Sequence, residues 1–122
     1  TVEKHVKFLG LTLDDQLSWN QHIDHLCKKI STGIYVVRRI KLVGGLQAAK
    51  TAYFSLVESH IRYGLIVWGG SSATNINRIL VFQKKAIRAL ADLGPRDSCR
   101  EAFKTLEILT VVALYIQEVI LH

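Results

Sequence analysis

The sequence of 122 residues predicts a mainly α-helical protein, a small bundle of about five helices preceded by one β-strand or half hairpin. Apolar residues recur at steps of three or four over most of the chain, as in helices with one buried face. Glycine pairs and a Gly-Pro step separate these periodic stretches. Only the N-terminal end contains a run of β-forming residues, and the length suits a single core.

The predicted strand covers residues 6–13, which are rich in β-forming residues and alternate in part at Val6 and Phe8 and at Leu11 and Leu13. Gly10 interrupts the run, as a β-bulge would. Asp14 and Asp15 follow and favour a turn. Because a lone strand is not stable in water, we expect it to pair with a segment outside this chain.

The longest periodic stretch predicts a helix that opens at Ser18 with a capping box and ends at Gly44-Gly45. A second helix is expected from about Leu46 to Gly64. The four apolar residues 65–68 are expected to form a connector. A third helix is expected from the polar cluster at residues 71–75 to Leu90, before the stop at Gly94-Pro95.

Two further helices are expected near the C-terminus. Ser98 and Glu101 have the spacing of a second capping box, which predicts a short helix over the following residues. Thr110 is expected to begin the last helix, whose apolar pattern is still periodic at His122. Because position 1 is Thr and the sequence contains no methionine, we expect the chain to be an excised or processed segment.

Basic residues are concentrated in the middle of the sequence. Residues 25–91 contain eleven Lys or Arg and the single acid Glu58, a net charge of +10, whereas the two flanks together carry −4. Such asymmetry indicates a polyanionic partner, nucleic acid before an anionic membrane. A basic surface that only keeps the protein soluble is the alternative.

Several classes of site are disfavoured by the sequence. Asp14 and Asp15 are neighbours, so as strand residues they would point to opposite faces and could not hold a metal pair. His22, His25 and Cys27 are splayed around a helix and do not converge on one zinc. We therefore expect no metal site, no catalytic residues and no cofactor in this chain.

The cellular setting is inferred from cysteine count and hydropathy. Two cysteines are too few for a disulfide framework, which favours an intracellular protein of the nucleus or cytoplasm. The longest apolar runs are much shorter than the ~20 residues of a membrane-spanning helix. We therefore expect a soluble protein with no membrane partner.

The polar side of the first helix suggests a surface that grips a nucleic-acid backbone. Basic and aromatic residues recur there at steps of three and four, and the third helix adds a second set. Two solvated amphipathic helices would show the same pattern, so the alternative remains open. The candidate nucleic-acid-binding residues are Lys28, Tyr35, Arg38, Arg39, Lys84, Lys85 and Arg88. Arg96 and Arg100, outside the basic block, are expected to contribute less.

An ordered series of short motifs resembles the jockey-type non-LTR (LINE-like) retrotransposon reverse transcriptases. The series consists of Phe8-Leu9-Gly10, Leu13-Asp14, Leu17-x-Trp19-x-x-His22-Ile23, Tyr63-Gly64-x-x-x-Trp68-Gly69, Leu80-x-x-x-Gln83-Lys84-Lys85-Ala86-Ile87-Arg88, Cys99-Arg100, Leu106 and Leu109-Thr110-x-x-x-Leu114-Tyr115. Each motif is loose, but their order is fairly specific. At Thr110 the family usually has proline.

The resemblance implies a place within a polymerase. Residues 1–16 resemble the primer grip at the edge of the palm, carried by Phe8, Leu9 and Gly10, and residues 17–122 resemble the helical thumb. The parent would be an RNA-directed DNA polymerase whose palm aspartates bind Mg²⁺; those aspartates have no counterpart here, so this chain is expected to be inactive alone.

Two functions follow from the resemblance. The first is a non-catalytic thumb that grips an RNA or RNA–DNA duplex without regard to sequence, and contacts the parent's palm domain. The alternative is a host-adopted fragment that acts as a helical protein-interaction module and associates with itself through apolar surface.

Overall fold

The computed structural model describes residues 7–8, 11–12, 16–63, 65–70 and 73–121. The described part is mainly helical, which confirms the predicted fold class. Its elements are β1 (Lys7–Phe8), β2 (Leu11–Thr12), α1 (Gln16–Tyr53), the π-helical segment η2 (Phe54–Glu58), α2 (Ser59–Arg62), α3 (Leu65–Trp68), α4 (Ala73–Ala91), α5 (Arg100–Leu106) and α6 (Val111–Leu121).

At the N-terminal end, four residues are described as a small antiparallel ribbon. Lys7 lies opposite Thr12, and Phe8 lies opposite Leu11. Where described, this region therefore has two short strands that pair with each other, and the expectation of one strand paired outside the chain was wrong for these residues. The remainder of the predicted strand and the Asp14-Asp15 turn lie outside the described residues.

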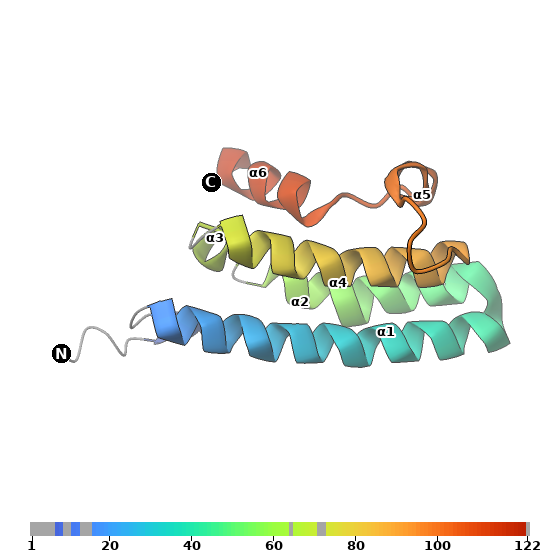
Figure 1. Cartoon of the computed structure of the whole chain (residues 1–122), viewed down its shortest axis with the longest axis horizontal. Coiled ribbons are helices and arrows are strands. Elements are labelled where there is room, and N and C mark those ends of the chain that lie inside the picture. Colours follow the sequence, from blue (N-terminus) through green and yellow to red (C-terminus); the bar gives the residue numbers. More distant parts are fainter. Residues whose placement is uncertain (1–6, 9–10, 13–15, 64, 71–72, 122) are drawn as a thin grey trace.

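Helix α1 is a hairpin of two arms, residues 16–44 and 46–53, separated by Gly45 (Figure 1). Gly45 has φ 83° and ψ −174°, a left-handed φ that side chains rarely tolerate. The predicted end of the first helix at the glycine pair is confirmed. The helix begins at Gln16, two residues before the predicted cap.

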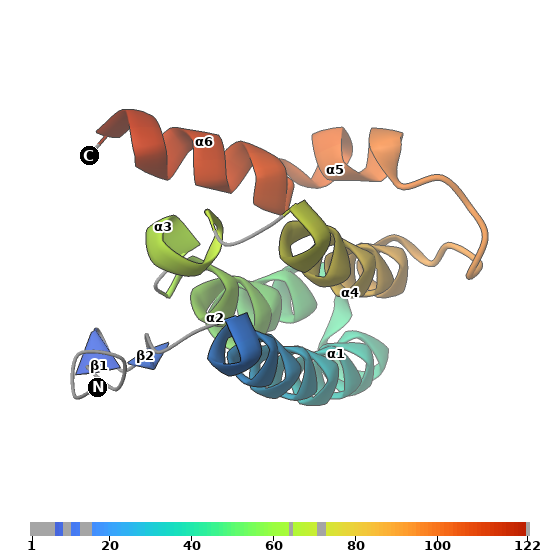
Figure 2. The ribbon, with the colours of Figure 1, turned by 60° about the vertical axis from the view of Figure 1, so that its left-hand side comes forward.

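Three helical segments make up the body of the molecule, two that run in the same direction and one that runs back. The first arm of α1 packs along α4, and the second arm continues through η2 and α2 back along the same bundle (Figures 1 and 2). The first arm of α1 closely approaches η2 at Gly33, where a Cβ atom would lie 2.6 Å from the carbonyl oxygen of Leu56. Only glycine allows this approach without a shift of backbone.

A second layer covers one side of this bundle. Helix α6 lies across α3 and α4, and α5 packs on α4 (Figure 2). Residues 65–68, expected as a connector, form the short helix α3. The capping box predicted at Ser98 was also wrong: the N-cap of α5 is Cys99, and the Ser98 hydroxyl accepts a hydrogen bond from the Arg100 N–H at 3.3 Å.

Helix α6 begins after Thr110, as predicted. The Thr110 hydroxyl accepts a hydrogen bond from the Ala113 N–H at 3.2 Å. This side-chain bond satisfies one of the N–H groups left unpaired in the first turn of a helix. Thr110 therefore caps this helix.

The core is largely apolar, and Gln83 is a fully buried polar residue within it. The Gln83 side chain donates to the Tyr53 hydroxyl at 3.0 Å and to the Leu109 carbonyl at 2.9 Å, and it accepts from the Val111 N–H at 2.8 Å. Gln83 thus joins α4 to the second arm of α1 and to the start of α6. The largest fully buried apolar side chains are Trp68, Tyr53, Ile23, Ile30, Ile61, Leu65, Ile79, Ile87, Leu90 and Leu114.

None of the described helices combines the length and the apolar character needed to cross a membrane.

Candidate nucleic-acid interface

The outer face of α1 carries Lys28, Tyr35 and Arg39. The helical spacing of 100° per residue places them within about 40° of one another, on the side away from the core. All three are exposed, and Tyr35 is 61% exposed. The Arg39 guanidinium lies 5.9 Å from the centre of the Tyr35 ring, a cation–π contact that positions the charge over an aromatic surface.

Arg38 belongs to a different surface. It lines an open groove of about 920 Å³ between the first arm of α1 and α4, together with Lys85 and Arg88. The α1 and α4 positions are about fifty residues apart in sequence and meet only because the two helices are packed side by side (Figure 1). The predicted binding residues of α1 are therefore divided between an outer face and a groove.

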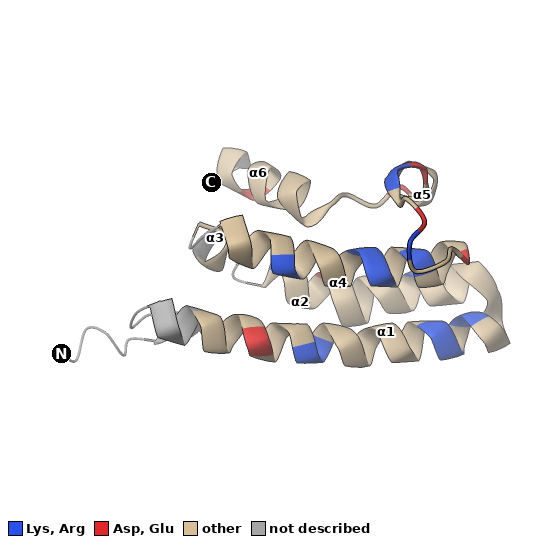
Figure 3. Ribbon diagram, viewed as in Figure 1, with Lys and Arg blue, Asp and Glu red and all other residues tan. Residues whose placement is uncertain are grey.

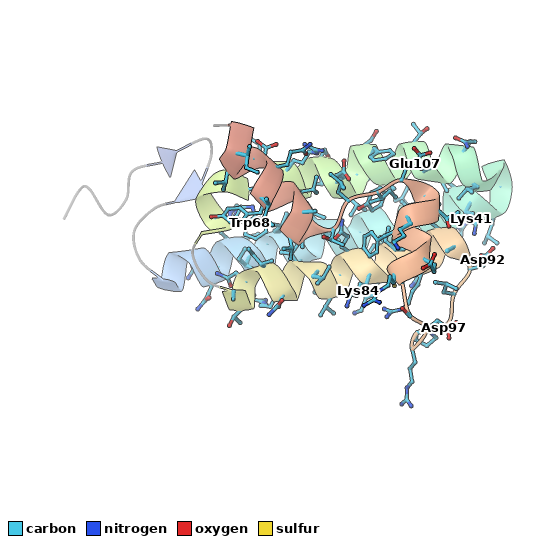
Figure 4. All side chains as sticks on the ribbon, turned by 90° about the horizontal axis from the view of Figure 1, so that it is seen from above. Lys41, Trp68, Lys84, Asp92, Asp97 and Glu107 are labelled. Atoms are coloured by element: carbon cyan, nitrogen blue, oxygen red, sulfur yellow. The ribbon has the colours of Figure 1, made fainter. Side chains whose placement is uncertain are left out.

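Lys41 lies in the same groove but makes structural contacts. Its ammonium group donates to the Leu90 carbonyl at 2.5 Å and lies 2.8 Å from the Asp92 carboxylate. Figure 4 shows Lys41 and Asp92 next to each other near the end of the bundle where α1 turns back. A cation at the last carbonyls of α4 is favourable, because those oxygens carry partial negative charge.

A second groove of about 880 Å³ lies between α4 and α5. Lys84 and Arg88 line it from α4, so Arg88 borders both grooves. The other side contributes three basic residues that follow the basic block: Arg96 and Arg100, which the sequence predicted to contribute less, and Lys104, which it did not single out. Arg100 and Lys104 are four residues apart, a spacing that places them on one side of α5, whereas Arg96 lies in the turn before this helix.

Ion pairs distinguish the cations that stabilise the fold from the cations that remain available to bind an anion. Arg78 pairs with Asp24, and Arg62 bridges Glu58 at 3.3 Å and Glu118 at 3.4 Å. In the described ranges, no carboxylate lies within ion-pair distance of the cations predicted to bind nucleic acid, which are Lys28, Arg38, Arg39, Lys84, Lys85 and Arg88. Figure 3 shows several of the chain's Lys and Arg residues along α1 and α4.

Two of these cations are oriented by uncharged groups. Arg88 donates from Nε to the Asp97 carbonyl at 3.0 Å, and the Lys85 ammonium lies 4.7 Å from the centre of the Phe82 ring. Both contacts leave the positive charge uncompensated by an acid. The side chains are therefore held at the groove with their charge available.

Three other features of the sequence were considered as sites: the primer grip, a metal site and Cys27. Phe8 lies in β1, whereas Leu9 and Gly10 of the predicted primer grip lie outside the described residues. No group of three His, Cys, Asp or Glu side chains in the described part of the chain could hold a metal ion. Cys27 is buried, and burial raises the pKa of its thiol.

Comparison with known proteins yields two relatives from Drosophila melanogaster. Over 89 residues the chain is 32% identical to a protein named probable RNA-directed DNA polymerase from transposon BS. Over 90 residues it is 29% identical to the RNA-directed DNA polymerase from mobile element jockey. Each match covers 70% of this chain and 10% of the relative.

No family model matches the sequence, and no solved structure matches the fold. The chain spans about a tenth of the length of the curated relatives it matches. It is a segment related to the jockey-type non-LTR retrotransposon reverse transcriptases.

Proposed function

We propose that this chain is a thumb-like segment of a retrotransposon RNA-directed DNA polymerase that grips the backbone of a primer–template duplex. Its relatives are named as RNA-directed DNA polymerases, and both match it over 70% of its length. The segment binds and does not catalyse; the chemistry belongs to the palm of a parent polymerase, with its Mg²⁺. Residues 1–16 would be the primer grip beside that palm.

The observation that carries the proposal is the groove lined by Arg38, Lys85 and Arg88. Three cations from two helices line one open groove, without an ion-pair partner among the described residues. Uncompensated cations close together create a positive potential that attracts an anion. A nucleic-acid backbone supplies such anions at a regular spacing.

The spacing of the basic residues on the outer face of α1 suits a duplex backbone. Lys28 and Arg39 are eleven residues apart on α1, which is about 16 Å along the helix axis. On one strand of a duplex this length corresponds to about five phosphates, at about 3.4 Å per nucleotide along the axis. Contacts to phosphate and sugar carry no sequence information, so we expect binding indifferent to base sequence.

A salt titration of duplex binding tests the proposal. With about four phosphates neutralised, log affinity on B-DNA should fall against log salt with a slope near −3.6. The variant Arg38→Ala/Lys85→Ala removes two cations of the groove and should flatten the slope by up to about two units. Affinity should be the same on duplexes of unrelated sequence.

The matched control is Lys29→Ala/Lys50→Ala, which removes the same charge from other positions. Lys29 lies about 180° around α1 from Arg38, and Lys50 lies on the second arm. The control should keep a slope close to that of the unmodified chain. Equal slopes for all three proteins, or a strong preference for one base sequence, would contradict the proposal.

A second candidate function rests on the outward face of α6. This face is apolar and exposed, with Ile120 76% accessible to solvent. The exposed residues of this face are Val112, Ile116, Val119 and Ile120, and exposed Leu109 lies just before the helix. Contiguous exposed apolar residues commonly mark protein interfaces. The face would contact the parent's palm or, in a host-adopted fragment, a second copy of the chain.

Sedimentation equilibrium tests whether the α6 face mediates self-association. The chain should self-associate as concentration rises, and Ile116→Glu/Ile120→Glu should keep it monomeric because a buried unpaired charge is strongly unfavourable at an interface. A chain that stays monomeric at the highest soluble concentration would leave the α6 face without a role in self-association.

A further inference from the structure

The turn between the two arms of α1 carries the two most exposed large apolar side chains that the structure describes. Leu42 is 85% exposed and Val43 is 92% exposed. They stand directly before the glycine pair at which the chain reverses, at one end of the bundle (Figure 1). Single exposed apolar residues are ordinary on protein surfaces, so their exposure alone assigns nothing.

Their position relative to the cationic groove is the second observation. Leu42 lines the same groove as Arg38, Lys85 and Arg88. On α1 it follows Arg38 by four residues, about 6 Å along the axis and on nearly the same side. A strand whose phosphates are held by Arg38 and Lys85 would therefore run past Leu42 within a few ångströms.

The turn is also held in place by contacts with the end of α4. Lys41 donates to the Leu90 carbonyl at 2.5 Å and pairs with Asp92 at 2.8 Å, which ties the end of the first arm to the end of α4. This contact fixes the residue immediately before Leu42. The tip of the turn, Leu42 and Val43, is therefore held in a fixed position with its apolar side chains exposed, where they can contact a neighbouring molecule.

An exposed apolar tip beside cations matches one mode of nucleic-acid binding. Proteins that enter the minor groove insert leucine, isoleucine or phenylalanine between base steps, which partly unstacks the bases and kinks the duplex. In RNA-containing duplexes of A-form the minor groove is wide and shallow, so a two-residue tip can reach the bases. The cations beside the tip favour a polyanion over an apolar protein partner.

We propose that Leu42 and Val43 are a wedge that inserts from the minor groove between stacked bases of the duplex held by the cationic groove. The inference rests on the proposed function, because the groove must hold the backbone for the tip to reach the bases. It adds a direct contact with bases, independent of their sequence, to a grip otherwise limited to phosphates. The wedge would fix the position of the duplex along the thumb.

The test uses the full chain and RNA–DNA hybrids in which 2-aminopurine replaces adenine at successive positions of the DNA strand. Unstacking of 2-aminopurine raises its fluorescence. The unmodified chain should raise the fluorescence at one or two adjacent positions, and Leu42→Ala/Val43→Ala should lose this rise. The slope of log affinity against log salt should stay unchanged, because no cation is removed.

The matched control is Tyr63→Ala/Val81→Ala, which removes two exposed side chains, each 53% accessible, at positions that do not line this groove. This control should keep the fluorescence rise. Thermal unfolding of both variants verifies that they are folded, as substitutions at exposed positions are expected to be.

The outcomes separate the two proposals. Salt-dependent binding without a fluorescence rise, or with an equal rise in Leu42→Ala/Val43→Ala, would overturn the wedge and leave the backbone grip standing. No salt-dependent binding by the unmodified chain would overturn the grip and the wedge together. Binding to phosphatidylserine vesicles that requires Leu42 and Val43, with no fluorescence rise on hybrids, would assign the tip to a membrane and also overturn the wedge.

Discussion

The buried centre around Gln83 and the groove beside it use polar side chains of the same helix in opposite ways. The Gln83 side chain makes three hydrogen bonds to groups of α1, α6 and the segment before α6. One and two residues later, Lys84 and Lys85 line open grooves without an ion-pair partner in the described ranges. The segment Gln83-Lys84-Lys85 thus combines a residue that maintains the fold with residues available for a ligand.

This contrast predicts two separable kinds of defect. Substitution in the centre should lower the free energy of unfolding, and any loss of binding should follow from unfolding. Substitution in the grooves should change the salt dependence of binding while the fold stays intact, because exposed charges contribute little to stability.

Gln83→Leu should have the largest effect on stability. It removes the hydrogen-bond partner of the Tyr53 hydroxyl, the Leu109 carbonyl and the Val111 N–H within the protein. Leaving buried polar groups unsatisfied costs about 1–3 kcal/mol each, partly relieved by water, so we expect a loss of about 3 kcal/mol. Chemical denaturation measures it.

Tyr53→Phe is the control for this substitution, because it removes one hydroxyl and keeps the ring in the core. Its cost should be nearer 1 kcal/mol. If Gln83→Leu were as stable as the unmodified chain, the centre would be ordinary core and the contrast with the grooves would disappear.

Gly33→Ala should have the next largest effect. The new Cβ would lie 2.6 Å from the Leu56 carbonyl oxygen and 3.1 Å from a methyl carbon of Val57. Both neighbours belong to a packed helical segment, so the helices must move apart, at a cost of about 1–3 kcal/mol. Ser31→Ala, exposed on the same helix, should change the unfolding free energy by less than about 0.5 kcal/mol.

Lys41→Ala sharpens the comparison within the groove itself. Lys41 caps α4 and pairs with Asp92, so its loss should lower stability by about 1 kcal/mol and change the salt slope little. Lys85→Ala should do the reverse, with nearly unchanged stability and a slope flatter by up to about one unit. If Lys41→Ala and Lys85→Ala behaved identically in denaturation and in salt titration, then the contacts of a cation would not predict whether it stabilises the fold or binds a ligand.

Sequence patterns predicted the elements with strong periodicity and missed the ones without it. The apolar stripe of α1 ends at a glycine that needs a left-handed φ, so this helix and its end could be predicted. The residues 65–68 are apolar without a period, which cannot distinguish a connector from the short helix α3. At Ser98 the capping pattern is present, but the N-cap is the following residue, Cys99.

The site was predicted less completely than the fold, because its residues meet only through tertiary packing. Arg38 and Arg39 were both predicted as binding residues of α1, but only the packing shows that Arg38 lies in the groove shared with α4. A charge count along the sequence ended at residue 91 and left out Arg100, which lines the same groove as Lys84. Which cations are available also depends on ion pairs such as Arg78 with Asp24, formed across 54 residues.

The smallest predicted effect is a pH dependence that arises from His22, at the edge of the core. Burial lowers the pKa of His22 below its usual value, and the nearby charges of Lys29 and His25 lower it further. The folded protein therefore binds this proton more weakly than the unfolded chain does. As pH falls below about 6.5, the unfolded chain gains a proton that the folded protein resists, so stability should decrease. Denaturation midpoints measured at pH 7.5 and 5.5 should differ less for His22→Gln than for the unmodified chain, whereas His25→Gln, at an exposed position, should keep most of the difference. An equal pH dependence in all three proteins would place the titrating group elsewhere in the chain.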